Sequence, residues 1–267
     1  MNTPKPIGIL DSGVGGLSVL REIRALLPHR PLLYIGDSAH CPYGNKAPEV
    51  IQSRVFQLTD YLLEQEVETV VIACNSATIA AVEALRAAYP VTFVGMEPAI
   101  KPAASRTMTG VVGVLATEAS LAGEKFHRLV DTHAEGVRVI TRQCADFVRL
   151  VEAGTLDGPE VDTAVKDAVT PLLDAGADVL VLGCTHYPFL RPAIAACAGP
   201  DVQILDTGTA VARRTAAVLE EPDPSTNLAI LGRIELSTTG PLEQLERLAP
   251  RLLSGIDGSF ECQPLDL

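Results

Sequence analysis

Eight short runs of aliphatic and β-branched residues recur along this 267-residue chain, with helically spaced stretches between several of them. The runs are apolar throughout, which is typical of parallel strands covered on both faces. Alternation of this kind predicts parallel βαβ units and an α/β fold. The predicted strands are 7–10, 32–35, 69–73, 92–95, 111–115, 137–140, 179–182 and 202–205.

Helical spacing and its punctuation by Pro and Gly predict the helices that link these strands. Four helices are expected in the first two thirds of the chain, at 17–27, 47–66, 79–88 and 159–175. The C-terminal part predicts a helix at 210–219, a strand near 233–236 and a last helix at 242–253.

Two segments of the first half resemble two segments of the second. Residues 7–12 resemble 112–117, and 70–76 resemble 180–185, at offsets of 105 and 110 residues. The similar offsets predict two related α/β halves, each with a hydroxyl-bearing turn after one strand and a cysteine after another. A chance likeness between strand–turn segments is the alternative.

Composition and charge narrow the class of partner. The net charge is −12 and Lys/Arg clusters are lacking, so we do not expect nucleic acid binding. The N-terminal sequence has no signal-type segment, and no apolar run reaches the roughly 20 residues that cross a bilayer, so we expect a cytoplasmic protein away from membranes. The six scattered cysteines predict free thiols in a reducing compartment.

Asp11-Ser12-Gly13-Val14-Gly15-Gly16 follows the first predicted strand and opens a helix, where backbone N–H groups bind anions. A dinucleotide-binding turn is the rival interpretation, strengthened by Asp37 after the next strand. Against it, Ser18 stands where that motif needs Gly or Ala, and Asp11 would face the charge of a pyrophosphate. A tight turn without a ligand is the third possibility.

The turn Pro42-Tyr43-Gly44 follows the second strand. Pro42 makes it rigid, and a backbone amide together with the Tyr43 hydroxyl could point at a ligand oxygen. Taken alone, such a turn is more often an ordinary loop than a binding site.

Cys74 and Cys184 are the most informative pair, because each follows an apolar strand where open α/β sheets bind ligands. Small polar residues and a predicted helix start come next, and a thiol in that setting has its pKa lowered from about 8.5. One such cysteine is more often a packing residue than a reactive one. Two cysteines at matching positions of two matching halves favour a reactive role.

Two facing thiols suit racemisation at a carbon atom, which needs a base on one face and an acid on the other. His186 could orient or deprotonate Cys184, although a structural histidine is the alternative. Asp11 could do the same for Cys74 or hold a substrate ammonium. A zinc site is disfavoured, because His40, Cys41, Cys184 and His186 lack the spacing of a closed site.

At these residues the chain resembles the glutamate racemases, over nearly its whole length. The segments that carry the resemblance are 7–17, 42–44, 73–75, 183–188 and the pair Asp206 and Gly208. Family members usually read Cys-Asn-Thr-Ala-Ser where this chain has Ser76 and Thr78, which keeps the hydroxyl at position 76 and removes a methyl group.

The resemblance implies an α/β fold of two pseudo-symmetric domains, each a mainly parallel sheet flanked by helices, with the active site in the interdomain cleft. The C-terminal segment would return to the first domain, giving domains at 1–97 with 211–267 and at 98–210. It also implies cofactor-independent interconversion of L- and D-glutamate without pyridoxal phosphate, D-glutamate supply for peptidoglycan, and a homodimer.

The resemblance further implies roles for individual residues. Cys74 and Cys184 would be the acid/base pair, assisted by Asp11, His186 and Glu152. The residues implied to contact the substrate are Asp11, Ser12, Pro42, Tyr43, Gly44, Cys74, Asn75, Ser76, Thr117, Cys184, Thr185 and His186. Two other classes stay open from the residues alone: a two-lobed amino-acid-binding module, and a nicotinamide oxidoreductase that depends on Asp37.

Overall fold

The computed structural model describes residues 4–220 and 231–267, so part of the N-terminal segment considered above lies outside the described residues. The chain divides into two compact units, each with its own sheet. Unit 1 comprises Met1–Met96 and Gly208–Leu267, and unit 2 comprises Glu97–Thr207. The expected α/β class, with two parallel sheets flanked by helices, is confirmed.

Unit 1 contains a parallel sheet in the order β10-β9-β2-β1-β3-β4. Its strands are β1 (Ile7–Asp11), β2 (Leu32–Gly36), β3 (Thr69–Ile72), β4 (Thr92–Val94), β9 (Ile234–Thr238) and β10 (Phe260–Pro264). Because β9 pairs with β2, the C-terminal segment contributes strands to the first sheet.

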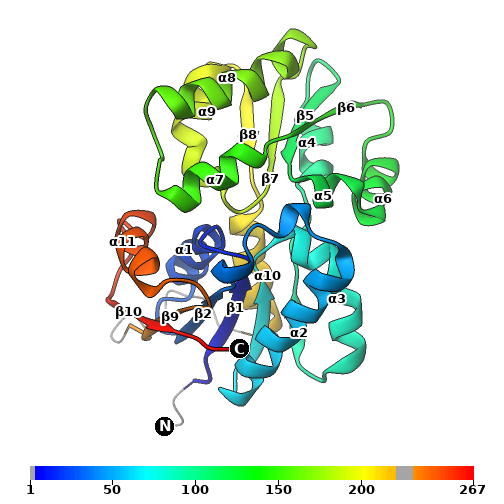
Figure 1. The fold of residues 1–267 in the computed structure, drawn as a ribbon. Helices are drawn as coiled ribbons and strands as arrows, with labels where there is room; N and C mark the ends of the chain where they lie inside the picture. Colours follow the sequence, from blue (N-terminus) through cyan, green and yellow to red (C-terminus); the bar gives the residue numbers. More distant parts are fainter. Residues whose placement is uncertain (1–3, 221–230) are drawn as a thin grey trace. The chain divides into compact units, whose positions relative to one another are not determined.

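Helices cover both faces of this sheet (Figure 1). Connections from β1 to β2 and from β2 to β3 run in opposite directions across the sheet, so right-handed crossovers place α1 and α2 on opposite faces. Helix α1 packs with α10 and α11, and α2 packs with α3. Their bounds are α1 (Leu17–Leu26), α2 (Pro48–Glu64), α3 (Asn75–Ala88), α10 (Gly208–Val218) and α11 (Leu242–Leu252).

Unit 2 contains a parallel sheet in the order β6-β5-β7-β8. Its strands are β5 (Val111–Ala116), β6 (Arg138–Gln143), β7 (Val179–Gly183) and β8 (Gln203–Leu205). Helix α4 packs with α6, and α8 packs with α7 and α9. The helices are α4 (Ile100–Arg106), α5 (Glu118–Ala122), α6 (Glu124–His133), α7 (Ala145–Ala153), α8 (Pro159–Asp174) and α9 (Arg191–Ala198).

The two sheets share a four-stranded core in the same order and register. The order β2-β1-β3-β4 of unit 1 corresponds to β6-β5-β7-β8 of unit 2. Gly8 of β1 lies beside Val70 of β3, and Gly113 of β5 lies beside Leu180 of β7, which are the residues that the offsets of the sequence repeat pair. The repeat is therefore structural as well as sequential.

Glycine at this shared position lets a crossover helix approach the central strand. A Cβ at Gly8 would lie 3.1 Å from Leu62 of α2, and one at Gly113 would lie 2.8 Å from Leu172 of α8. Both are closer than ordinary van der Waals contact. Each helix thus packs directly on the backbone of the strand that leads to the predicted site.

Element boundaries differ from the sequence predictions in places where burial or capping decides them. Helix α3 begins at Asn75 rather than at residue 79, because the Cys74 sulfur caps its first turn. Strand β6 continues to Gln143 through exposed polar residues, since it lies at the edge of its sheet. Strand β10 and helices α4, α5, α6, α7 and α9 were not predicted.

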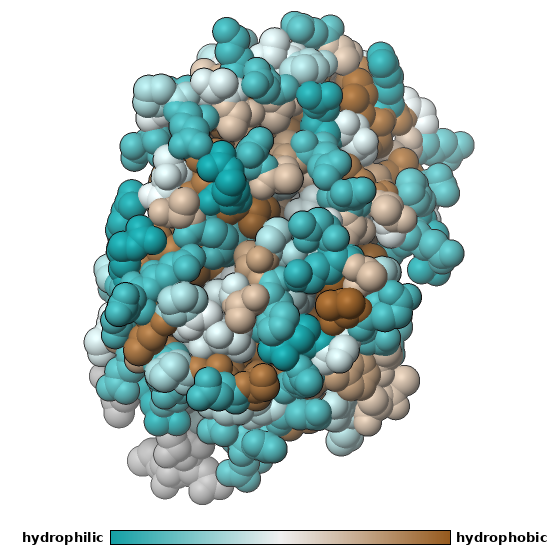
Figure 2. All heavy atoms as spheres, viewed as in Figure 1, coloured by the Kyte–Doolittle hydropathy of each residue, from teal (hydrophilic) through white to brown (hydrophobic). Residues whose placement is uncertain are grey.

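Figure 2 shows a face on which hydrophilic side chains predominate and hydrophobic ones lie scattered among them. The large hydrophobic side chains that the structure shows exposed include Val50, Met108, Leu231 and Leu267. Across residues 4–220 and 231–267, every helix is too short or too polar to cross a membrane.

Candidate active site

The loop after β1 is fixed by close packing against its neighbours. Asp11 is fully buried, and its Oδ1 accepts a 2.7 Å hydrogen bond from the backbone N–H of Gly13. Tyr34 donates its hydroxyl to the Gly13 oxygen at 2.6 Å. A Cβ at Gly16 would lie 2.7 Å from the Asp11 Cβ, and one at Gly36 would lie 2.5 Å from the Gly13 oxygen. The turn is therefore preformed at the carboxyl edge of the sheet.

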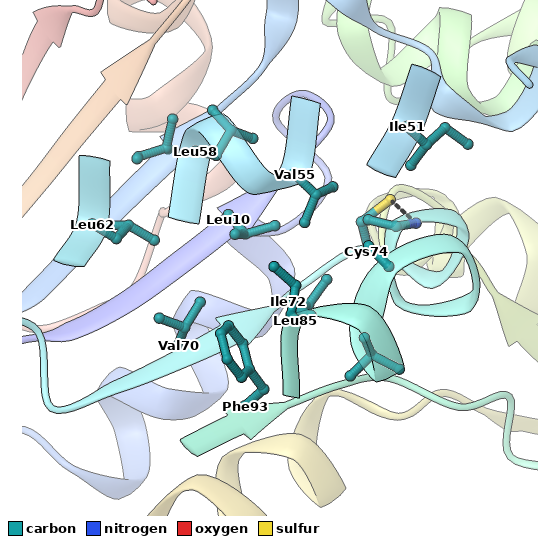
Figure 3. Close-up of a cluster of buried hydrophobic side chains, with 14 of the residues drawn as sticks. Leu10, Ile51, Val55, Leu58, Leu62, Val70, Ile72, Cys74, Leu85 and Phe93 are labelled. Atoms are coloured by element: carbon teal, nitrogen blue, oxygen red, sulfur yellow. Dashed lines mark hydrogen bonds between the residues drawn. The ribbon is translucent and has the colours of Figure 1, made fainter. Parts of the chain in front are cut away.

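Cys74 follows β3, the strand beside β1, and lies at the N-terminus of α3. Its sulfur accepts the N–H of Ala77 at 3.5 Å, and its thiol donates to Ser12 Oγ at 3.8 Å. In Figure 3 the sulfur is turned toward this first turn of α3, and Cys74 belongs to one of the hydrophobic clusters of buried residues. The Cys74 sulfur thus lies at the end of α3 where helix N–H groups point toward it.

Asn75 and Ser76 open α3 and are both buried, each with 4% of its surface exposed. The Asn75 side-chain amide has no hydrogen-bond partner in the part of the chain that the structure describes. Burying an amide without a partner is costly, so this group calls for an explanation such as a catalytic role or a bound water or ion. Asn75 is thus an oriented donor and acceptor beside Cys74.

Asp37, after β2, is the hub of a buried polar cluster. Its carboxylate accepts hydrogen bonds from Arg54 at 2.9 and 3.0 Å, from the Tyr43 hydroxyl at 2.6 Å and from Thr239 Oγ1 at 2.7 Å. Nδ1 of the His40 ring lies 3.1 Å away. Burial alone would raise the pKa of Asp37, but these hydrogen bonds outweigh it and hold the pKa below its ordinary value.

This cluster corrects one sequence interpretation and weakens another. The Tyr43 hydroxyl donates to Asp37 and does not point freely at a ligand oxygen, so only the backbone N–H groups of Tyr43 and Gly44 retain that predicted role. The oxidoreductase alternative needs Asp37 to bind a ribose, but Asp37 is fully buried and its carboxylate is already bonded to the protein.

Cys184 follows β7, the counterpart of β3, and begins a polar relay within unit 2. Its sulfur lies 3.6 Å from Nδ1 of His186, and Nε2 of His186 lies 2.7 Å from Oε1 of Glu152 on α7. The histidine is 2% exposed, and the Glu152 side chain is 15% exposed. When Nε2 donates to the carboxylate, Nδ1 is left to accept the thiol proton.

Two threonines complete the predicted set in unit 2. Thr185 is buried between Cys184 and His186. Thr117 follows β5, as Ser12 follows β1, and caps α5 by accepting the N–H of Ser120 at 3.3 Å. Its hydroxyl donates to Ser120 Oγ at 2.9 Å.

The structure brings the predicted residues together in two groups, one in each unit. Unit 1 joins Ser12 and Cys74 directly, with Asp11 and Asn75 as chain neighbours. Unit 2 joins Cys184, His186 and Glu152. Arg54 was missed because it lies 17 residues from Asp37 in the middle of an amphipathic helix, where an arginine is usually a solvated surface group.

A duplicated α/β fold with one cysteine at the carboxyl end of the same strand in each unit defines the structural class. The family model described as Asp/Glu/Hydantoin racemase matches residues 7–215. The chain belongs to this family.

Relatives and solved structures narrow the family further. The chain is 51% identical over 236 residues to the glutamate racemase of Herpetosiphon aurantiacus, covering 88% of this chain and 93% of that one. The structure of glutamate racemase RacE1 from Bacillus anthracis matches with a TM-score of 0.86 and 32% identity, over 100% of this chain and 99% of that one.

The Escherichia coli glutamate racemase, solved with L-glutamate and the activator UDP-MurNAc-ala, matches with a TM-score of 0.84 and 34% identity, over 98% of both chains. The expected resemblance to glutamate racemases is confirmed, and with it the enzyme class, an amino-acid racemase among the isomerases.

Proposed function

We propose that this enzyme interconverts L- and D-glutamate without a cofactor, using Cys74 and Cys184 as an acid/base pair on opposite faces of the substrate. The observation that carries the proposal is the equivalence of the two cysteines. Each follows the counterpart of the same strand, in sheets whose registers match. Each also has polar neighbours of its own.

The proposed reaction moves one proton off the α-carbon and another onto it. One cysteine, as thiolate, removes the α-hydrogen from one face, and the other, as thiol, donates a proton from the opposite face. The reverse direction exchanges the two roles, so each sulfur must be stable both with and without its proton.

The surroundings of each sulfur support this double role. The Ala77 N–H donates to the Cys74 sulfur, where it stabilises negative charge, and the Ser12 oxygen accepts a hydrogen bond from the thiol. His186, oriented by Glu152, takes and returns the Cys184 proton. We assign Asp11 to the substrate ammonium or to Cys74, since it lies at the end of the neighbouring strand.

A thiolate is a weak base for an α-hydrogen, so the site must also stabilise developing negative charge. We assign this to neutral donors at the substrate carboxylates: the Asn75 amide, the hydroxyls of Ser12, Ser76 and Thr185, and the backbone N–H groups of Tyr43 and Gly44. Thr117, whose hydroxyl already donates to Ser120, is proposed to contact the substrate as an acceptor. The unpartnered buried amide of Asn75 supports this assignment, because a bound carboxylate would satisfy it.

The choice of glutamate rests on the relatives, among them a glutamate racemase solved with L-glutamate. We propose that the D-glutamate serves peptidoglycan synthesis, and hence cell wall and cell shape, in the cytoplasm. The six cysteines are free thiols, which agrees with a reducing compartment. We further propose domains at 1–97 with 211–267 and at 98–210, and a homodimer.

The test combines cysteine variants with exchange of the α-hydrogen in deuterated water. Cys74→Ser and Cys184→Ser should each abolish racemisation while the fold persists. Cys197→Ser and Cys262→Ser, which change half-buried thiols elsewhere, should keep it. A binding module would bind glutamate without exchanging its α-hydrogen, and an oxidoreductase would need NAD and Asp37. Racemisation that survives in either of the first two variants would overturn the proposal.

A further inference from the structure

Tyr187, the residue after His186, has a buried contact that the relay itself does not explain. It is the first residue of the short helix Tyr187–Leu190, and its side chain is fully buried. Its hydroxyl donates a 2.9 Å hydrogen bond to the main-chain oxygen of Cys144. Cys144 directly precedes α7, the helix that carries Glu152.

The tyrosine ring strengthens the same attachment. It packs edge-on against Phe147 in the first turn of α7, with ring centroids 5.1 Å apart and an interplanar angle of 78°. Phe147 is buried as well. Tyr187 therefore ties the loop that contains Cys184 and His186 to the beginning of α7 through both a hydrogen bond and a ring contact.

A second attachment lies near the other end of the helix, where Glu152 meets His186 at 2.7 Å. Cys144 and Glu152 are eight residues apart, a rise of about 12 Å along a helix. A helix held at one point can pivot, whereas two points at this separation fix its direction. We propose that Tyr187 is a positioning residue that holds α7 so that Glu152 stays within hydrogen-bond distance of His186.

Unit 1 contains an arrangement related to the Tyr187–Cys144 contact, which indicates that this contact is a recurring feature of the fold. Asp37 follows β2 as Cys144 follows β6, and each donates its N–H to the last residue of the central strand, at 2.9 and 3.1 Å. Each also accepts a hydrogen bond from a tyrosine hydroxyl. The Asp37 carboxylate accepts from Tyr43 in unit 1, and the Cys144 main-chain oxygen accepts from Tyr187 in unit 2. Both tyrosines are chain neighbours of predicted site residues.

The Tyr187 hydroxyl stays a donor across the working pH range of such an enzyme. Burial, followed by the neighbouring sulfurs of Cys184 and Cys144, raises the pKa of Tyr187 well above its ordinary value. The attachment therefore neither titrates nor adds charge beside the thiol, which suits a group that only orients the relay.

The inference rests on the proposed relay, so its test is a double-mutant cycle between Tyr187→Phe and Glu152→Gln. Tyr187→Phe keeps the ring and removes the hydroxyl, and the Cys144 oxygen still accepts the Phe147 N–H at 3.3 Å. We expect kcat/KM for glutamate to fall about tenfold. This is less than the roughly hundredfold cost of misplacing a catalytic group by about 1 Å, because the ring contact with Phe147 remains. In the Glu152→Gln background, the same change should have little further effect.

The pH profile supplies a readout that a purely structural role would not move. Tyr187→Phe and Glu152→Gln should shift the pH dependence of kcat/KM in the same direction. Thr59→Val removes a buried hydroxyl that bonds within α2, and it should leave both rate and profile unchanged. If Tyr187→Phe does not fold, Phe147→Leu weakens the same attachment and enters the same cycle.

The outcomes distinguish failure of the positioning role of Tyr187 from failure of the proposed relay itself. If Glu152→Gln lowers the rate but Tyr187→Phe does not, or if the two losses multiply independently, the positioning role is wrong and the relay stands. If Glu152→Gln leaves the rate unchanged, the relay is wrong and the role of Tyr187 falls with it. Coupled losses with a shared shift in the pH profile support the inference.

Discussion

Gly36→Ala should reduce activity as well as stability, because it displaces the preformed turn beside Cys74. Gly36 ends β2 next to Asp11. An alanine Cβ there would lie 2.5 Å from the Gly13 oxygen, whereas ordinary contact begins at 3.4 Å. The Gly13 carbonyl would therefore have to move by about 0.9 Å, the difference between these distances. That oxygen also accepts the Tyr34 hydroxyl, so this hydrogen bond would stretch or break.

A displacement of this size at Ser12 and Gly13 is expected to lower kcat/KM for glutamate by about a hundredfold. The cost in the free energy of unfolding should be about 1–3 kcal/mol, the usual range for overpacking. The rate would be followed as loss of optical activity from L-glutamate, and stability by urea unfolding of the same preparations.

Gly8→Ala is the matched control, at the other end of the neighbouring strand. Its Cβ would meet only side-chain atoms, of Leu62 at 3.1 Å and Val67 at 3.2 Å. It should lose comparable stability and keep kcat/KM within about twofold, since the turn is not displaced. Wild-type activity in Gly36→Ala, or equal losses of activity in the two variants, would refute the reasoning.

Three further predictions concern buried polar groups. Burial would raise the pKa of Asp37, but hydrogen bonds from Arg54 outweigh it, so folding lowers this pKa. The ionised Asp37 therefore stabilises the fold above the unfolded pKa of about 3.9, and this contribution is lost as pH falls through the folded pKa. Asp37→Asn should therefore cost about 3 kcal/mol of unfolding free energy at pH 7 and less below pH 4; a difference independent of pH would contradict this. Burial raises the pKa of the Cys144 thiol to about 12, so iodoacetamide at pH 8 should leave that peptide unlabelled by mass spectrometry, and rapid labelling would count against the structure. Asn75→Leu should raise the free energy of unfolding by about 1 kcal/mol, because it removes an unpartnered buried amide, and it should also raise KM for glutamate. A less stable variant would argue against a role of this amide in binding the substrate.

The centres of nine strands could be predicted from sequence, because buried parallel strands are continuous apolar runs. Strand β10 could not, since Phe260–Pro264 lies at the sheet edge and contains Glu261 and Gln263. The helices missed in unit 2 include short ones and α6, whose buried face is a single phenylalanine. Such elements are formed by packing against a sheet more than by local pattern.

Less of the site than of the fold could be predicted from the sequence. The sequence repeat indicated equivalent positions for Cys74 and Cys184, and the matching registers of the two sheets agree with it. The sequence could not show which polar atoms form hydrogen bonds with one another. Tyr43 and Asp37 are only six residues apart, yet the hydrogen bond from the Tyr43 hydroxyl to the Asp37 carboxylate is seen only in the folded loop. The same holds for Tyr187 and Cys144, which are 43 residues apart. The catalytic and substrate-contacting assignments stay predictions.

The most direct test of two thiols acting from opposite faces follows the label in a partial reaction. Wild-type enzyme would be given L-glutamate in deuterated water, the reaction stopped well before equilibrium, and both enantiomers separated for mass spectrometry. The account predicts deuterium at the α-carbon of the D-glutamate formed and almost none in the remaining L-glutamate, because different groups remove and donate the proton. Equal labelling of both enantiomers, or D-glutamate that retains its original hydrogen, would contradict it.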